Sequence, residues 1–229
     1  MSTILSELVL TRYLYNKAQV IESLQKAIDE KDYESALYWA YEIYYSGFED
    51  EVVDFIMLLF ENRYKHHVKF RLYIRKKYDE NKVTKDPIFV ATILKNMQMK
   101  NHDRPETVKP RFVVVKSDQI DYLRTMEPKQ SMWKQLRTAC DKAVIPIKNI
   151  KKAEEVKFLD IFRNKWLFYA SRSPIWKARI LEYHGKIDGR KKIVEFVNDD
   201  DLEGFHDKYD YEPDEQPLKI QKGCMGIPN

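Results

Sequence analysis

The sequence is poor in the residues that build sheet-rich or disulfide-bonded proteins. Only six glycines and two cysteines occur among its 229 residues. Because so few glycines supply few tight turns, the composition argues against β-sandwiches and barrels and favours helices. The two cysteines, Cys140 and Cys224, stand far apart and in different contexts. They do not make a disulfide framework, so we expect the protein to work in a reducing compartment.

Long apolar runs are also missing. The longest, residues 55–60, is far shorter than the roughly 20 residues that a membrane-spanning helix needs. The N-terminus lacks a basic start and carries Glu7, which does not fit a secretory signal. We therefore expect a soluble protein of the cytoplasm that has no membrane partner.

Patterns that would indicate catalysis or a cofactor are scarce. The six glycines do not form a phosphate-binding loop, and no two histidines stand three or four residues apart. The one candidate for a magnesium site is the acidic run Asp199, Asp200, Asp201 and Glu203, with His206 close by. A contiguous acidic run is more typical of a helix start, where carboxylates face the positive end of the helix dipole. We expect a protein that is not an enzyme and holds no cofactor, and a magnesium-dependent activity at this run is the least favoured alternative.

The clearest architectural pattern lies in residues 32–60. Asp32 is suited to cap a helix with apolar residues at helical spacing, and Gly47 can end that helix in the left-handed conformation. A second amphipathic helix follows directly. Similar patterns predict helices over residues 17–30 and 86–99, the latter opening with the Asp-Pro pair that favours a helix start. We therefore predict a mostly α protein, built as a helical array of stacked helix hairpins.

A polar segment over residues 101–110 divides this pattern. It holds two prolines and lacks periodicity, which predicts a linker. The linker would separate an N-terminal helical array, residues 1–100, from a C-terminal helical subdomain, residues 111–229, with an acidic region near its end. Residues 111–116 carry the one β-like run, and two interpretations of it stay open: a short strand, or an extended segment pressed against the helices.

The second half of the chain continues with helical patterns. Residues 129–143 and 152–170 are predicted helices, and the pair at 173–174, Ser-Pro, starts another. Residues 191–197 fit a helix or a strand, and we favour the helix. We expect residues 218–229, which hold one proline and two glycines, to form a flexible or draped tail.

The strongest charge pattern is a basic run over residues 63–77. No acidic residue lies between Glu61 and Asp79. Helical spacing places Tyr64, Val68 and Leu72 on the inner side of the helix that carries the run, and Phe70, Tyr73 and Ile74 widen this apolar stripe. We take its seven cations as the candidate binding residues: Arg63, Lys65, Lys69, Arg71, Arg75, Lys76 and Lys77.

Three interpretations of the basic run stay open. It can be a solvated helix face, a surface that contacts nucleic-acid phosphates and releases their counterions, or a patch that binds an acidic protein partner. The acidic run at 199–203 could itself bind residues 63–77, within one molecule or between copies. The aromatic residues of the predicted helix at 33–46 are expected in the core, with stacking on the bases of a single strand as the alternative. These are Tyr38, Trp39, Tyr41, Tyr44 and Tyr45.

The segment Glu-Ser-Ala-Leu-Tyr-Trp-Ala-Tyr-Glu-Ile-Tyr-Tyr-Ser-Gly-Phe-Glu-Asp at residues 34–50, with the apolar helix up to residue 60, resembles the helical C-terminal region of clamp-loader-type ATPases. The likeness is to the MgsA/Werner-interacting group of replication-associated ATPases, where such a hairpin belongs to the oligomerising collar. The ATPase motifs of that group are missing, so the resemblance implies an assembling helical region and no ATPase activity. The composition and the Ser-Pro-Ile-Trp-Lys-Ala-Arg-Ile segment also resemble uncharacterised proteins of large cytoplasmic DNA viruses. This resemblance implies that the protein is located in a virus factory or in the virion.

Two functional hypotheses follow from the sequence. The first is a non-enzymatic helical protein that binds nucleic acid, without reading its sequence, or binds a replication or gene-expression assembly, through residues 63–77. The alternative is a structural or adaptor protein, such as a virion or scaffold component. Its oppositely charged parts would then pair between copies in a homo-oligomer.

Overall fold

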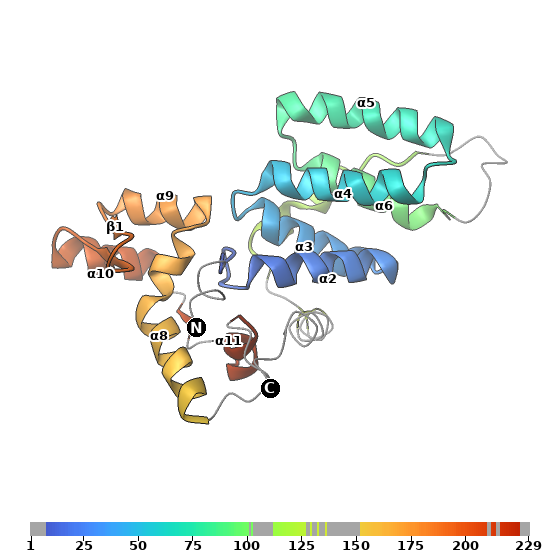
Figure 1. Cartoon of the computed structure of the whole chain (residues 1–229). Coiled ribbons are helices and arrows are strands. Elements are labelled where there is room, and N and C mark those ends of the chain that lie inside the picture. The colour runs from blue at the N-terminus through green and yellow to red at the C-terminus, as the bar shows by residue number, and fades with distance from the viewer. Residues whose placement is uncertain are drawn as a thin grey trace. The chain divides into compact units, whose positions relative to one another are not determined.

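The computed structural model describes residues 8–100, 102, 112–126, 129, 132, 136, 152–209, 212–213 and 216–224, and these are mostly helical, as predicted (Figure 1). Residues 24–132 form one compact unit, which we name the α3–α6 unit. Residues 1–23 and 133–229 form the other, which we name the α8–α11 unit. The units therefore divide the chain elsewhere than at the predicted linker, of which only His102 lies in the described part.

The predicted hairpin is the centre of the α3–α6 unit. After α2 (Lys17–Asp29), helices α3 (Tyr33–Tyr44) and α4 (Glu49–Arg63) follow one another closely. The Asp32 carboxylate caps α3 by accepting the N–H of Ser35 at 3.1 Å, and Gly47 adopts φ = 90° in the turn. Both sequence predictions are confirmed, because each depends on the local chain alone.

Tyrosine hydroxyl groups tie α3 to the segment around α6 (Ile88–Met99). The Tyr41 hydroxyl donates to the Pro87 carbonyl and the Tyr44 hydroxyl to the Lys85 carbonyl, both at 2.6 Å. Burial is the main cause that raises the pKa of Tyr44 to about 12, so its hydroxyl stays protonated and able to donate. Helix α6 lies between α3 and α5 (Val68–Thr84) (Figure 1).

The β-like run near residues 111–116 is an extended segment and not a strand over its described part, residues 112–116. The Asn96 side chain takes the place of a partner strand. Its Nδ2 donates to the Val113 carbonyl at 2.7 Å, and its Oδ1 accepts the Val113 N–H at 3.1 Å. The second of the two open interpretations is thus confirmed. Two short 3₁₀ turns, η1 (Ser117–Gln119) and η2 (Asp121–Arg124), complete the described part of this unit.

The α8–α11 unit is built around two crossing helices and a small hairpin of strands. Helix α8 (Lys152–Ala170) is followed by α9 (Pro174–Glu182), and the two cross steeply (Figure 1). Strands β1 (Lys186–Asp188) and β2 (Ile193–Glu195) pair antiparallel. Helices α10 (Asp199–Lys208) and α11 (Leu218–Cys224) complete the described elements. Within the described residues, no helix has the length and apolar character to cross a membrane.

Three local predictions for these elements were wrong. Residues 193–195 form a strand and not a helix, because Asp188 turns the chain back and lets β2 pair with β1. Residues 218–224 form α11 where we expected a tail. Helix α5 continues to Thr84 and ends at Lys85 with φ = 50°, whereas the polar composition of residues 79–86 predicts a connection between helices. The predicted helix at 129–143 lies largely outside the described residues.

Candidate functional site

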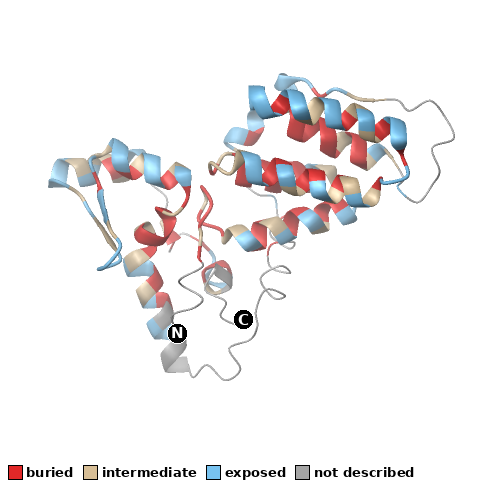
Figure 2. Cartoon of the chain, turned by 45° about the horizontal axis from the view of Figure 1, so that its top comes forward, coloured by how far each residue is buried: buried red, intermediate tan, exposed pale blue. Residues whose placement is uncertain are grey.

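The basic run begins at the last residue of α4 and continues into α5, which is buried along one side and exposed along the other (Figure 2). Only part of the predicted apolar stripe lies inside: Phe70 and Ile74 are buried, as the stripe predicts, whereas Val68 and Leu72 are 62% and 64% exposed. The helix breaks between Arg63 and Val68, so Tyr64 does not share a continuous helix with Val68 and Leu72. The sequence pattern had treated these positions as one periodic stripe, which is why the prediction failed.

Two arginines of the run are paired with α4. The Glu61 carboxylate accepts the Nε–H groups of Arg71, at 2.7 Å, and of Arg75, at 2.6 Å. Partial desolvation alone would raise the pKa of this carboxyl, but the hydrogen bonds from Arg75 and Arg71 hold it below its ordinary value. Further along the same two helices, the Tyr78 hydroxyl donates to Asp54 at 2.6 Å. A ladder of polar contacts thus joins α4 and α5.

Two further cations of the run also have acidic partners. Arg63 pairs with Asp29 of α2, and Lys77 pairs with Glu80 at 2.7 Å within α5. Lys65, Lys69 and Lys76 are exposed. The seven predicted residues therefore do not form one uniform cationic surface, and Arg71 and Arg75 have a structural role in holding α5 on α4.

The outer side of α5 combines lysines with aliphatic side chains. Val68, Leu72 and Val83 follow one another along this side at helical spacing, and Val83 is 86% exposed. Lys69 and Lys76 flank this row. We name Lys65, Val68, Lys69, Leu72 and Lys76 the α5 face.

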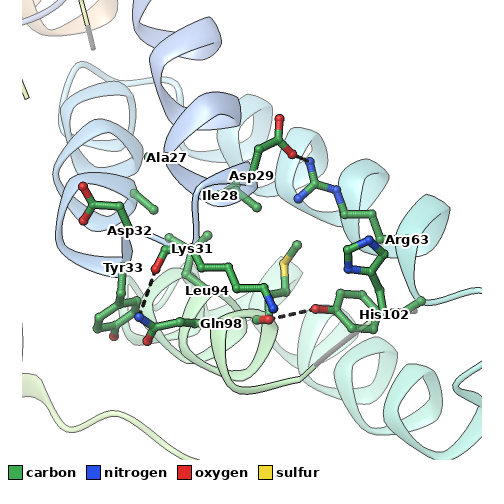
Figure 3. Close-up of a pocket in the computed structure, with 13 residues that line it drawn as sticks. Ala27, Ile28, Asp29, Lys31, Asp32, Tyr33, Arg63, Leu94, Gln98 and His102 are labelled. Carbon is green, nitrogen blue, oxygen red and sulfur yellow. Dashed lines mark hydrogen bonds and ion pairs between the residues drawn. The ribbon is translucent and has the colours of Figure 1, made fainter. Parts of the chain in front are cut away.

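A concavity of about 550 Å³, open solvent included, is lined by residues of α2, α3, α4 and α6 (Figure 3). Ile28, Leu94 and Met97 supply apolar wall, and the Arg63–Asp29 pair lies at its edge. Some of its polar groups bond within the protein: the Gln98 amide donates to the Lys31 carbonyl at 3.2 Å, and the Tyr64 hydroxyl donates to the Met97 carbonyl at 2.8 Å.

The acidic run is the first turn of α10, as the favoured interpretation held. The Asn198 side chain caps this helix by accepting the Asp201 N–H at 2.8 Å, and Asp201 lies 3.1 Å from His184. Across the described ranges, no group of three or more His, Cys, Asp or Glu side chains is placed to hold a metal ion.

The aromatic residues of α3 belong to the core. Tyr38, Trp39, Tyr41 and Tyr44 are buried, with Trp39 fully inaccessible. A base could not reach these rings without unfolding the helix. The prediction that they pack in the core is confirmed, and the stacking alternative is wrong for these four residues.

A second basic segment, residues 177–192, was not singled out from the sequence. It holds six lysines and arginines against Glu182 and Asp188. The low count of acids around the Gly189 turn was the signal that could have identified it. Comparison with protein-family models, with curated proteins and with solved structures gave no match for this chain.

Proposed function

We propose that this chain is a non-enzymatic adaptor that binds an acidic, amphipathic segment of a protein partner through the α5 face. One observation carries the proposal: Glu61 pairs with both Arg71 and Arg75, while Val68 and Leu72 are exposed beside lysines. A partner helix with aliphatic side chains on its contact side and carboxylates along its edges would match this arrangement.

The charges and apolar groups of the α5 face favour a protein ligand over a nucleic acid. Binding to phosphates depends on cations that have no nearby acid, because the affinity comes from the counterions they release. Arg71 and Arg75 do not meet this condition, because both pair with Glu61. Exposed aliphatic groups gain nothing from a phosphate backbone, whereas burying such groups contributes about 25 cal/mol per Å² in a protein interface.

Nucleic-acid binding at the same face is the second candidate, supported by the exposure of Lys65, Lys69 and Lys76. A single-strand or duplex ligand would use these three lysines and would not depend on Leu72. The two candidates can therefore be separated by substituting one aliphatic residue and one pair of lysines.

The test uses fluorescence anisotropy with two probes. The first is a labelled synthetic helix of about 15 residues, the length at which a helix begins to be stable in water, with leucines on one side and glutamates on the other. The second is a labelled DNA duplex. We expect the chain to bind the peptide, and Leu72→Ser to lower the affinity for the peptide about tenfold because apolar burial is lost. The double variant Lys65→Gln with Lys76→Gln should leave the affinity for DNA unchanged.

A polyglutamate peptide of equal charge is the control for charge alone. Equal binding of polyglutamate and of the amphipathic peptide would contradict the role of the aliphatic residues. A loss of DNA binding in the lysine double variant would support the second candidate instead.

A further inference from the structure

We propose that α9 and the β1–β2 hairpin form a DNA-binding surface that takes the phosphates and major groove of a duplex. The proposal goes beyond the α5 face and stands on residues of the other unit. It begins from the chain order of the elements: a long helix, a short turn, a second helix, and then a two-stranded hairpin.

Helices α8 and α9 have the form of a helix-turn-helix. Only residues 171–173 separate them, and the helices cross steeply in both views (Figures 1 and 2). A three- or four-residue turn between helices at a steep angle is the arrangement that presents a second helix to the major groove. The side chains of Ser171 and Ser173 cap the end of α8, donating to the carbonyls of Phe168 and Ala170.

Helix α9 is firmly packed on its inner side. The rings of Trp166 and Trp176 meet nearly at right angles, 85°, with centroids 5.4 Å apart. The Trp176 indole N–H donates to the Thr11 carbonyl at 2.9 Å, and Arg172 donates to the Leu8 carbonyl at 2.8 Å. A surface held this firmly on its inner side loses little conformational entropy when a ligand binds its outer side.

The outer side of α9 fits close approach to a groove. Trp176 and Ile180 face the core, and Lys177, Ala178 and Leu181 lie on the exposed side. Alanine allows near contact, and the aliphatic group of Leu181 can meet thymine methyl groups. This side offers few hydrogen-bonding groups for base edges, so we infer weak sequence selectivity.

The hairpin supplies the charges for the backbone. Lys186, Arg190 and Lys192 are exposed, as is Lys177, and none of these four pairs with an acid among the residues that the structure describes. Lys191 does pair, with Asp188 and Glu195. The cations of the hairpin are thus mostly available to phosphates, in contrast to Arg71 and Arg75.

The hairpin tip is held in shape by Asp188. Its Oδ1 accepts the N–H groups of Arg190, at 2.8 Å, and Lys191, at 2.9 Å. This local turn fixes the backbone from which the side chains of Arg190 and Lys192 project. Asp188 is the one acid in the tip, and its hydrogen bonds to the backbone reduce its electrostatic repulsion of a phosphate.

The exposed acidic residues of α10 point away from Phe205, whereas Asp201 pairs with His184 just after α9. Phe205 is the buried residue of α10 and packs against Trp176 and Tyr183, on the inner side of α9. With about 3.6 residues per turn, the exposed acids of α10 fall on the side opposite Phe205. They are Asp199, Asp200, Glu203 and Asp207. The Glu182 carboxylate, on α9 itself, pairs with Lys208 and accepts the hydroxyl group of Tyr209.

The test measures the affinity of the full chain for a labelled DNA duplex across a salt series. We expect log affinity to fall with log salt at a slope of about −4, as four phosphate contacts give in B-form DNA. Lys186→Gln with Arg190→Gln should reduce the slope by about two and weaken binding about tenfold at low salt. Both positions are exposed, so the fold should persist, which circular dichroism checks.

The matched control is Lys65→Gln with Lys76→Gln, since each pair lowers the net charge equally from +4. This control should bind DNA as the unmodified chain does. A single strand of equal length and a duplex RNA should bind more weakly, because the A-form major groove is too narrow for a helix. The proposal is overturned if no duplex binds at low salt, if both double variants lose affinity equally, or if the RNA duplex binds as tightly as the DNA.

Discussion

The two basic regions of this chain differ in what surrounds their charges. On α5, Glu61 takes up Arg71 and Arg75, and the outer side exposes Val68 and Leu72. On the β1–β2 hairpin, Lys186 and Arg190 have no acidic partner among the described residues, and the one acid in the tip binds backbone N–H groups.

The comparison teaches that a count of lysines and arginines does not identify a phosphate-binding surface. The run over residues 63–77 has the larger number of cations, yet four of its seven are in ion pairs. The segment at 177–192 has four exposed cations, Lys177, Lys186, Arg190 and Lys192, that pair with no acid among the described residues. Under the two proposals, α5 binds protein and the hairpin binds DNA, which would make the chain a bridge between them.

The largest expected effect on stability comes from truncating Phe205, the buried residue through which α10 packs against α9. Phe205→Ala should lower the free energy of unfolding by about 3–5 kcal/mol, because a fully buried aromatic ring leaves a cavity. Urea denaturation measures the loss. Leu202→Ala, at an exposed position of the same helix, is the control and should change stability little. A loss below about 1 kcal/mol for Phe205→Ala would show that α10 does not support α9 in this way.

Gly185→Ala should have the next largest effect. A Cβ atom there would lie 2.6 Å from Ile180 Cγ2 and 2.9 Å from the Ile180 carbonyl oxygen, so the corner between α9 and β1 has no room for it. We expect a loss of about 1–3 kcal/mol from overpacking, measured by thermal unfolding. Gly189→Ala is the matched control, since nothing lies within 4 Å of its added Cβ. Equal effects at the two glycines would contradict the close approach at Gly185.

Glu61→Gln should lower the stability of the chain by about 1 kcal/mol at neutral pH, since a partly exposed carboxylate with two arginine partners is lost. The pKa of Glu61 is below its ordinary value, so its contribution is present above the ordinary glutamate pKa. It is lost as the pH falls through the lowered pKa. The stability difference between the two proteins should therefore shrink in acid, and a difference that persists there would show that the loss is not ionic.

The same substitution sharpens the comparison of the two regions. Glu61→Gln leaves Arg71 and Arg75 without their carboxylate partner. If α5 bound phosphates, affinity for a DNA duplex would rise. We expect no change, because the DNA surface lies on the hairpin.

Leu72→Ser should have the smallest effect on stability, within about 0.5 kcal/mol, because the side chain is already 64% exposed. Its effect should appear in binding to the acidic amphipathic peptide. Ile74→Ala, on the buried side of the same helix, is the contrasting variant and should cost about 2–5 kcal/mol. Similar stability losses for both variants would place Leu72 in the core.

Features set by neighbouring residues could be predicted from the sequence. The cap at Asp32, the turn at Gly47 and the helix starts next to Pro87 and at Pro174 each follow from a few adjacent residues. The register of α5 could not be predicted, because the break after Arg63 shifts the periodicity by an amount that the pattern does not encode. The strand at 193–195 depends on its pairing with β1, which is not a property of those residues alone.

The candidate site could be predicted only as a set of charges. Glu61 stands 10 and 14 residues before Arg71 and Arg75, and the pairing arises because α4 and α5 bring them together. The availability of Arg190 depends in the same way on Asp188 bonding the backbone. Composition identifies where charges are, and tertiary structure decides which of them a ligand can use.

The measurement that tests the central claim most directly is a titration of the ¹⁵N-labelled full chain with a DNA duplex, followed by amide chemical shifts. The account predicts that shifts concentrate in residues 177–192, in α9 and the hairpin, while residues 65–76 of the α5 face stay unchanged. Shifts concentrated in residues 65–76, with the hairpin unaffected, would contradict the division of the two basic regions into a protein surface and a DNA surface.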